Sequence, residues 1–182
     1  MNIEKLDIEG LAIITLKKFQ DKRGYFFEAF NEEEFRGKVS DVSFVQDNVS
    51  YSNYNIFRGL HYQLPPFEQG KYVQVLRGRV LDIAVDLRQS SRTFLEHVCV
   101  ELSEDNGKAF YIPPGFAHGF LVLSSEAYFM YKVTKYYAPH FERCLNWRDP
   151  ALTIDLGKIA PNMSDKDSHA PLFSDLKDEL TF

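Results

Sequence analysis

Residues 80–88 constrain the fold of this chain more than any other segment, because polar and apolar side chains alternate there without a break. The apolar face holds Leu81, Ile83, Val85 and Leu87, and the opposite face holds Asp82, Ala84, Asp86 and Arg88. A period of two residues is typical of a β-strand and does not suit a helix. Residues 72–76 indicate a second strand, and Arg77-Gly78 between the two predicts a β-hairpin over residues 71–88.

Short strands are predicted along the rest of the chain as well. The expected segments are 99–102, 109–112, 119–123 and 127–134, with polar or Pro-Gly turns between them. One helix is expected after Asn31, which can cap it together with Glu34 while Phe35 faces inward, and one helical turn is expected near 174–179. Many short strands with few helices predict an all-β sandwich, jelly roll or small barrel, and such folds often hold a ligand in the barrel mouth.

Composition narrows the classes of function. The 182 residues are expected to form a single domain, and the net charge of −5 disfavours a nucleic-acid partner, which would need a basic face. The sequence has no run of 18 apolar residues and no secretory leader, so no membrane partner and a cytoplasmic location are expected. Cys99 and Cys144 lie far apart without a zinc-binding spacing, and both are expected to be small buried thiols.

Two histidines stand in unusual surroundings. His61 follows Arg58 by three positions, which would place the two side chains on opposite faces of a regular strand unless Gly59 bends the chain. His118 is followed by Gly119, and a glycine inside a strand suggests a close approach of another backbone or of a ligand. A lone histidine is more often a hydrogen-bonded structural residue than a catalytic one, so each of them alone leaves both interpretations open.

Tyr131 and Lys71 add further reactive groups. The phenol of a strand tyrosine can act as a general acid when it points toward a histidine, and a buried lysine beside a ligand stabilises negative charge. A metal centre is not expected, because a β-barrel site usually takes two histidines from one strand at positions i and i+2. The five histidines of this chain show no such pair.

The reactive residues belong to longer strings that occur in order along most of the chain: DKRGYFFEAF at 21–30, QDN at 46–48, RGLHYQ at 58–63, QGKYVQVLRGRVLDIAVDLR at 69–88, YIPPGFAHGF at 111–120, YKVT at 131–134, WRDP at 147–150 and SDKD at 164–167. Taken together, these strings resemble the dTDP-4-dehydrorhamnose 3,5-epimerase family, whose members have a cupin-type jelly-roll fold, also called a double-stranded β-helix. The resemblance implies one cupin-like domain over residues 1–182, with the C-terminal segment 151–182 packed on the barrel.

The resemblance also implies roles for the reactive residues. His61 would be the general base, and Asp167 would fix its tautomer, with Asp165 as the competing choice in the same turn. Lys71 would stabilise the enolate formed next to the C4 ketone, and Tyr131 would return a proton from the opposite face. The chemistry needs neither a metal nor a redox cofactor, so no cofactor is expected.

Further residues match substrate-binding positions of the family. Arg58 would bind the diphosphate, and the other matching positions are Arg23, Glu28, Gln46, Asp47, Asn48, His118, Glu142 and Lys166. Family members are usually homodimers that exchange N-terminal strands, so residues 21–30 are expected to serve the site of the neighbouring subunit. The chain departs from the family pattern at Cys144, where a small residue such as glycine is expected, and at Gln74, where the residue is often basic.

The predicted reaction is the epimerisation at C3 and C5 of a nucleotide-linked 4-keto-6-deoxyhexose, dTDP-4-dehydro-6-deoxy-D-glucose, to dTDP-4-dehydro-L-rhamnose. The nearest alternatives are a mono-epimerase that acts at C3 or C5 only, and a CDP-linked substrate. An isomerase that moves the keto group is disfavoured by the matches at Lys71 and Tyr131. Two other classes, a metal-dependent cupin oxygenase and a sugar-binding module without activity, are disfavoured by the missing histidine pair and by the presence of both His61 and Tyr131.

Overall fold

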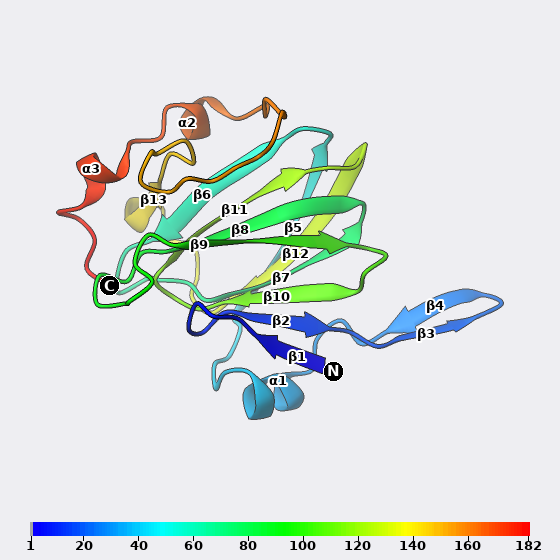
Figure 1. Cartoon of the computed structure of the whole chain (residues 1–182). Helices are drawn as coiled ribbons and strands as arrows, with labels where there is room; N and C mark the ends of the chain where they lie inside the picture. Colours follow the sequence, from blue (N-terminus) through cyan, green and yellow to red (C-terminus); the bar gives the residue numbers. More distant parts are fainter. Residues whose placement is uncertain (1) are drawn as a thin grey trace.

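Two antiparallel sheets face each other in the computed structural model, which describes residues 2–182 (Figure 1). The first sheet has the order β1 (Asn2–Lys5), β2 (Ala12–Thr15), β10 (Lys108–Ile112), β7 (Lys71–Arg77), β12 (Glu126–Val133) and β5 (Gln46–Asn53). The second has the order β13 (Glu142–Cys144), β6 (Phe57–Gln63), β11 (Phe116–Val122), β8 (Arg79–Asp86) and β9 (His97–Ser103). The chain passes repeatedly from one sheet to the other, which makes the fold a jelly roll and confirms the predicted all-β class.

The predicted hairpin over residues 71–88 is wrong. Both strands exist, but β7 pairs with β10 and β12 while β8 pairs with β11 and β9. Gly78, at a φ of +84°, turns the chain from one sheet into the other. Alternation of side chains indicates that a segment is a strand with two different faces, but it does not indicate which strand lies beside it.

Both faces of β8 are buried, so its alternation does not separate core from solvent. Val80 and Ala84 face the interior between the two sheets. Ile83 and Val85 face outward and pack under the C-terminal segment. Buried leucines of that segment complete this outer cluster: Leu152, Leu156, Leu176 and Leu180. The segment therefore covers the outer face of the second sheet and carries α2 (Asp165–Ser168) and α3 (Phe173–Leu176) on it (Figure 1).

The remaining short helices lie outside the two sheets. Helix α1 (Glu32–Lys38) begins as predicted, with Asn31 Oδ1 accepting the Glu34 backbone N–H at 3.0 Å. Phe35 on this helix is fully buried in an aromatic cluster with Tyr72 and Tyr111. The helical turn predicted near 174–179 is α3, and a 3₁₀ turn covers Pro139–Phe141. Among residues 2–182, no helix is both long enough and apolar enough to cross a membrane.

The two cysteines differ in environment. Cys144 is buried as expected, whereas Cys99 is exposed, so the prediction for Cys99 is wrong. Cys99 lies on β9, the last strand of its sheet, on the same exposed face as Glu101. An outward position on an edge strand has no second layer to cover it.

A third, two-stranded sheet forms an arm that projects from the body of the molecule in Figure 1. Its strands are β3 (Lys18–Asp21) and β4 (Gly24–Phe27). Three aromatic side chains of the arm are about half or more exposed: Phe19 at 52%, Tyr25 at 51% and Phe26 at 70%. Such a concentration of exposed aromatic surface is typical of a contact surface.

Strands β6 and β11 approach each other closely at two glycines. A Cβ atom on Gly119 would lie 2.7 Å from the Arg58 carbonyl oxygen and 3.1 Å from the Gly59 Cα. The close approach expected from Gly119 is therefore confirmed, and the partner is backbone. Gly59, at a φ of +130°, breaks the regular alternation of β6, so that both Arg58 and His61 border the same interior cavity despite their odd spacing.

The substitution Gly119→Ala tests this close approach. We expect it to lower the free energy of unfolding by about 1–3 kcal/mol, because the added methyl group meets backbone atoms that cannot move aside independently. Gly37→Ala is the matched control. A Cβ at Gly37 in α1 meets no atom within 4 Å, so it should stabilise the protein by about 0.5–1 kcal/mol. Urea unfolding of the three proteins measures both effects, and equal stabilities for the two variants would contradict the interpretation.

Candidate active site

A cavity of about 270 Å³ opens between the two sheets. Its walls include six of the residues singled out in the sequence: Arg58, His61, Lys71, His118, Tyr131 and Glu142. Strand β6 contributes from the second sheet, whereas β7 and β12 contribute from the first. The fold therefore gathers charged, imidazole and phenol groups from both walls into one hollow, which is the usual form of a small-molecule site.

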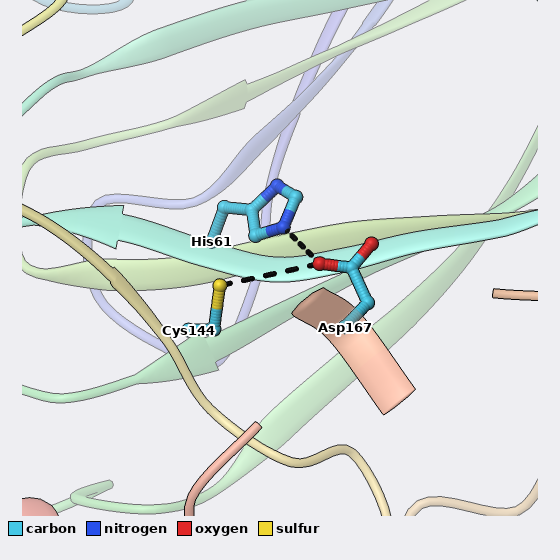
Figure 2. A group of neighbouring side chains, drawn as sticks. All are labelled: His61, Cys144 and Asp167. Atoms are coloured by element: carbon cyan, nitrogen blue, oxygen red, sulfur yellow. Dashed lines mark hydrogen bonds and ion pairs between the residues drawn. The ribbon is translucent and has the colours of Figure 1, made fainter. Parts of the chain in front are cut away.

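His61 and Asp167 form a hydrogen-bonded pair at this cavity. His61 Nε2 lies 2.6 Å from Asp167 Oδ1 (Figure 2). Among residues 2–182, the hydrogen bond of the ring is made by Nε2, which leaves Nδ1 available as a proton acceptor. Asp167, and not the exposed Asp165, makes this contact, because the short helix α2 turns Asp167 inward.

The carboxylate of Asp167 is held by several donors. Asp167 is 4% exposed, and burial acts to raise its pKa. Hydrogen bonds from His61, from the Gly59 backbone N–H at 3.4 Å and from the Ser164 hydroxyl outweigh that effect and lower the pKa. The group is therefore ionised at neutral pH, and an ionised carboxylate beside Nε2 favours the tautomer that carries its proton there.

Lys71 is a buried cation at the start of β7. The residue is 8% exposed, and its Nζ donates a hydrogen bond to the His61 carbonyl oxygen at 3.3 Å. Burial lowers the pKa of Lys71 to about 8, and the nearby carboxylates of Asp82 and Glu142 act in the opposite direction. The ammonium group is thus charged at pH 7 while being poorly solvated, which strengthens its interaction with any negative charge formed in the cavity.

His118 and Asp82 form a second buried pair. The two residues are 7% and 0% exposed, and His118 Nε2 lies 2.9 Å from Asp82 Oδ2. Burial lowers the pKa of His118, although Asp82 acts to raise it, so the ring is neutral at pH 7. Asp82 was not singled out in the sequence. The signal that could have identified Asp82 is its position on the same strand face as the small residue Ala84, where a carboxylate can be buried.

Tyr131 stands on the wall opposite His61. It lies on β12 and pairs in register with Asn48 of β5, while the next inward position of β5, Ser50, also borders the cavity. Burial raises the pKa of Tyr131, and the nearby Arg58 guanidinium acts to lower it. The phenol therefore keeps its proton at neutral pH, and it lies across the cavity from His61.

Arg58 and Glu142 bring opposite charges to the cavity walls. The Arg58 guanidinium is held by Ser52 Oγ at 2.9 Å and by the Tyr51 carbonyl oxygen at 3.2 Å. Glu142 accepts a hydrogen bond from Tyr137 Oη at 2.9 Å, and it forms an ion pair with Lys166. Burial acts to raise the pKa of Glu142, but its bonds with Lys166 and Tyr137 lower it overall. Tyr137 was not predicted, because a tyrosine in a loop carries no pattern of its own.

Six predicted binding residues do not border the cavity: Arg23, Glu28, Gln46, Asp47, Asn48 and Lys166. Arg23 lies on the projecting arm, where its side chain is 84% exposed and pairs with Asp21, and Glu28 is exposed just beyond the arm. Asp47 points away from the interior face of β5 and pairs with Lys132 at 2.6 Å. Gln46 and Asn48, bonded to each other at 2.8 Å, share the face of β5 that carries Ser50.

Cys144 adds a thiol beside the His61–Asp167 pair. Its Sγ lies 4.0 Å from Asp167 Oδ1, and the reactive atoms of His61, Cys144 and Asp167 all lie within 4.8 Å of one another (Figure 2). Burial raises the pKa of the Cys144 thiol to about 11. No spacing along the sequence indicates this group of ligand atoms, because His61, Cys144 and Asp167 come from three separate elements.

Comparisons with known proteins find close similarity over nearly the whole chain. A profile of the family described as dTDP-4-dehydrorhamnose 3,5-epimerase matches residues 5–175. A dTDP-4-dehydrorhamnose 3,5-epimerase of Shigella flexneri is 46% identical over 176 residues, which cover 96% of this chain and 97% of that protein.

Two solved structures have nearly the same fold as this chain. A 3,5-epimerase of Legionella pneumophila in complex with dTDP-4-keto-L-rhamnose superposes with a TM-score of 0.94 at 45% identity, covering 98% of this chain and 96% of that one. A 3'-monoepimerase of Streptomyces bikiniensis in complex with dTDP-quinovose superposes with a TM-score of 0.89 at 33% identity, covering 96% of this chain and 89% of that one.

The buried charge of Lys71 predicts a pH-dependent stability. The pKa of Lys71 is about 8 in the folded state, whereas its ordinary value is 10.5. Between these two pH values the unfolded chain therefore binds more protons than the folded protein does. Wild-type stability should therefore rise with pH across this window through Lys71. Lys71→Met removes the buried charge and should raise the free energy of unfolding at pH 7 by up to about 3 kcal/mol.

Urea unfolding at pH 7 and pH 10 measures this effect, with Lys177→Met at an exposed position as the control. The advantage of Lys71→Met over wild type should shrink between the two pH values, and that of Lys177→Met should stay near zero. A Lys71→Met protein that is less stable than wild type at pH 7 would show that the ammonium group contributes net stability.

Proposed function

This chain belongs to the dTDP-4-dehydrorhamnose 3,5-epimerase family, and from that premise we propose that its cavity epimerises dTDP-4-dehydro-6-deoxy-D-glucose at C3 and C5 to give dTDP-4-dehydro-L-rhamnose. The observation that carries the proposal is the placement of a base and an acid on opposite walls. The His61–Asp167 pair belongs to one side of the cavity and Tyr131 to the other. Inversion at carbon requires that a proton leave from one face and return to the other.

The base in this proposal is Nδ1 of His61. The C4 ketone of the sugar acidifies the hydrogens on C3 and C5, so an imidazole can remove them when it is held in hydrogen-bond reach. As Nδ1 gains the proton, the ring becomes an imidazolium whose Nε2–H points at the ionised Asp167, 2.6 Å away. The buried carboxylate stabilises that charge and keeps the ring in its orientation.

Lys71 is the proposed stabiliser of the enolate oxygen. Removal of the C3 or C5 proton moves negative charge onto the C4 oxygen, and a positioned cation in a site with little water can lower that barrier by several kcal/mol. Lys71 is buried and charged at pH 7, and its Nζ is anchored on the His61 carbonyl oxygen. The same residue therefore lies next to the proposed base and faces the cavity.

The remaining polar groups are proposed to bind and orient the nucleotide sugar. Arg58 presents a planar guanidinium, which suits the diphosphate oxygens. His118, kept neutral by burial, is proposed to hydrogen-bond the sugar. The linked Tyr137, Glu142 and Lys166 would contact the substrate on another part of the wall. No cofactor takes part in this mechanism. The absence of a resident cofactor and the cytoplasmic location both stay predictions.

A mono-epimerase is the second candidate function, because one of the similar structures is that of a mono-epimerase. The 3'-monoepimerase of Streptomyces bikiniensis shares the fold at a TM-score of 0.89. A single base and a single acid can serve one carbon or both, depending on how the acid is held against the ring. The difference between the two reactions therefore lies in proton return by Tyr131, which exchange measurements can follow at each carbon separately.

We also propose that the protein is a homodimer in which each arm serves the neighbouring cavity. Arg23 and Glu28 lie on or beside the projecting arm, away from the cavity of their own chain. The arm exposes Phe26, and the edge strand β5 exposes Val49 at 61%. Two apolar surfaces of one chain, one on an arm and one on a sheet edge, suit an exchange between two copies.

Proton NMR of dTDP-4-dehydro-6-deoxy-D-glucose in deuterium oxide tests the reaction. The wild-type protein should remove both the H3 and the H5 signals, whereas His61→Ala should slow the loss at both carbons by about 10²–10⁴-fold. Tyr131→Phe should leave exchange detectable but impair the appearance of the inverted product. His97→Ala, on the distant strand β9, should behave as wild type.

Each possible departure has a distinct meaning in this experiment. Loss of only one signal with the wild-type protein would favour the mono-epimerase. Full exchange by His61→Ala would show that another group is the base. No exchange by a folded wild-type protein would overturn the proposed substrate.

Mixing two inactive variants tests the exchanged arm. Arg23→Ala removes a binding residue from the arm, and His61→Ala removes the base from the cavity. If the arms exchange, a mixed dimer contains one cavity with both groups intact, so random reassociation should restore about a quarter of the sites. Mixing Arg58→Ala with His61→Ala is the control and should restore none, because both groups line the cavity of one chain. Equal recovery in both mixtures, or none in either, would contradict the exchanged arm.

A further inference from the structure

We propose that His61, Cys144 and Asp167 form a binding site for Zn²⁺, and that occupation of this site switches the enzyme off. The inhibitory consequence rests on the proposed role of His61, whereas the binding itself does not. The three side chains are labelled together in Figure 2, and their ligand atoms all lie within 4.8 Å of one another.

The fold brings the three ligands together through strand pairing and one short helix. Cys144 of β13 is the register partner of His61 on β6, and side chains at directly opposed positions of antiparallel strands lie next to each other. Asp167 reaches the same point from α2, with Oδ1 at 2.6 Å from His61 Nε2 and 4.0 Å from Cys144 Sγ. Its other oxygen faces the Gly59 backbone N–H, so the carboxylate is oriented before any cation arrives.

The spacing of these atoms suits a tetrahedral metal after small movements. Zinc binds nitrogen, oxygen and sulfur at about 2.0–2.3 Å, which separates neighbouring ligand atoms by about 3.5 Å. The distance between Sγ and Oδ1 would shorten slightly from 4.0 Å, and that between Nε2 and Oδ1 would lengthen from 2.6 Å. Rotations of the side chains supply changes of this size, so the backbone need not move.

The donor set selects a borderline-soft cation. One imidazole, one thiolate and one carboxylate carry two negative charges in total, which match a divalent ion. Calcium and magnesium prefer oxygen ligands alone and are disfavoured by the sulfur. The site is reached through the cavity, because the His61 side chain is 31% exposed and borders it.

Coordination removes the base from the reaction. The ring proton moves from Nε2 to Nδ1 by exchange with solvent, so that Nε2 offers its lone pair to the metal and the ring stays neutral with no net release of a proton. The thiol proton of Cys144 leaves to solvent as the sulfur binds. With Nδ1 protonated and Asp167 engaged by the metal, His61 can neither accept the substrate proton nor have its imidazolium stabilised.

Titration of the metal-free protein with Co²⁺ tests binding without reference to activity. A thiolate ligand produces a near-ultraviolet charge-transfer band with Co²⁺, and this band should appear in the wild-type protein and disappear when Zn²⁺ is added. Cys144→Ser and Cys144→Ala should lack the band. Cys99→Ser is the matched control for the exposed cysteine and should retain it.

Inhibition by Zn²⁺ is then measured, with the rate of each variant compared to its own rate in EDTA. Half-inhibition of Cys144→Ser should need at least about tenfold more Zn²⁺ than that of wild type or Cys99→Ser. A band that is absent from the wild type, or that persists in folded Cys144→Ser, overturns the site. Binding through Cys144 without inhibition would retain the site and overturn the switch. A protein that exchanges no proton at all would contradict the proposed function and leave the cobalt result intact as the test of the site.

Discussion

The close approach of β6 and β11 at Gly59 and Gly119 is the constraint on which the rest of the site depends. A side chain at Gly119 would meet backbone atoms at 2.7 Å, so the two strands can pair here only without one. Gly59, with its positive φ, lets Arg58 and His61 border the same cavity. On its other edge, strand β6 pairs with β13. Helix α2 packs against β6, and this contact places Asp167 beside His61.

The second constraint is the burial of charge in the space that this pairing creates. Lys71 keeps an ammonium group inside the barrel at a cost in stability, and the same burial lowers its pKa to about 8. Asp82 is fully buried and bonds His118, and Glu142 is held by Lys166 and Tyr137. A molecule optimised for stability alone would not retain an under-solvated cation here. Retention of it suits a site in which negative charge develops during a reaction.

The sequence predicted where the strands lie along the chain better than it predicted which strands pair with one another. The alternation over residues 80–88 and the cap at Asn31 are local signals, and both elements exist where they were expected. The predicted hairpin over residues 71–88 is wrong, since β7 and β8 lie in different sheets. Turn residues and alternation are equally compatible with a hairpin and with a crossing between facing sheets, because both bend the chain within two residues. The exposure of Cys99 was missed for a related reason, since an edge strand cannot be recognised from its own residues.

What the sequence determined by itself was the chemical inventory and the local backbone: strands with two distinct faces, a capped helix, and ordered strings of residues that identify the family. Tertiary structure alone decided which groups meet. It turned Asp167 rather than Asp165 toward His61, brought Cys144 beside both, and paired Asp82 with His118. Such contacts join residues as many as 106 positions apart. No local pattern encodes them, because the distance between two side chains on different strands depends on the register and packing of every element between them.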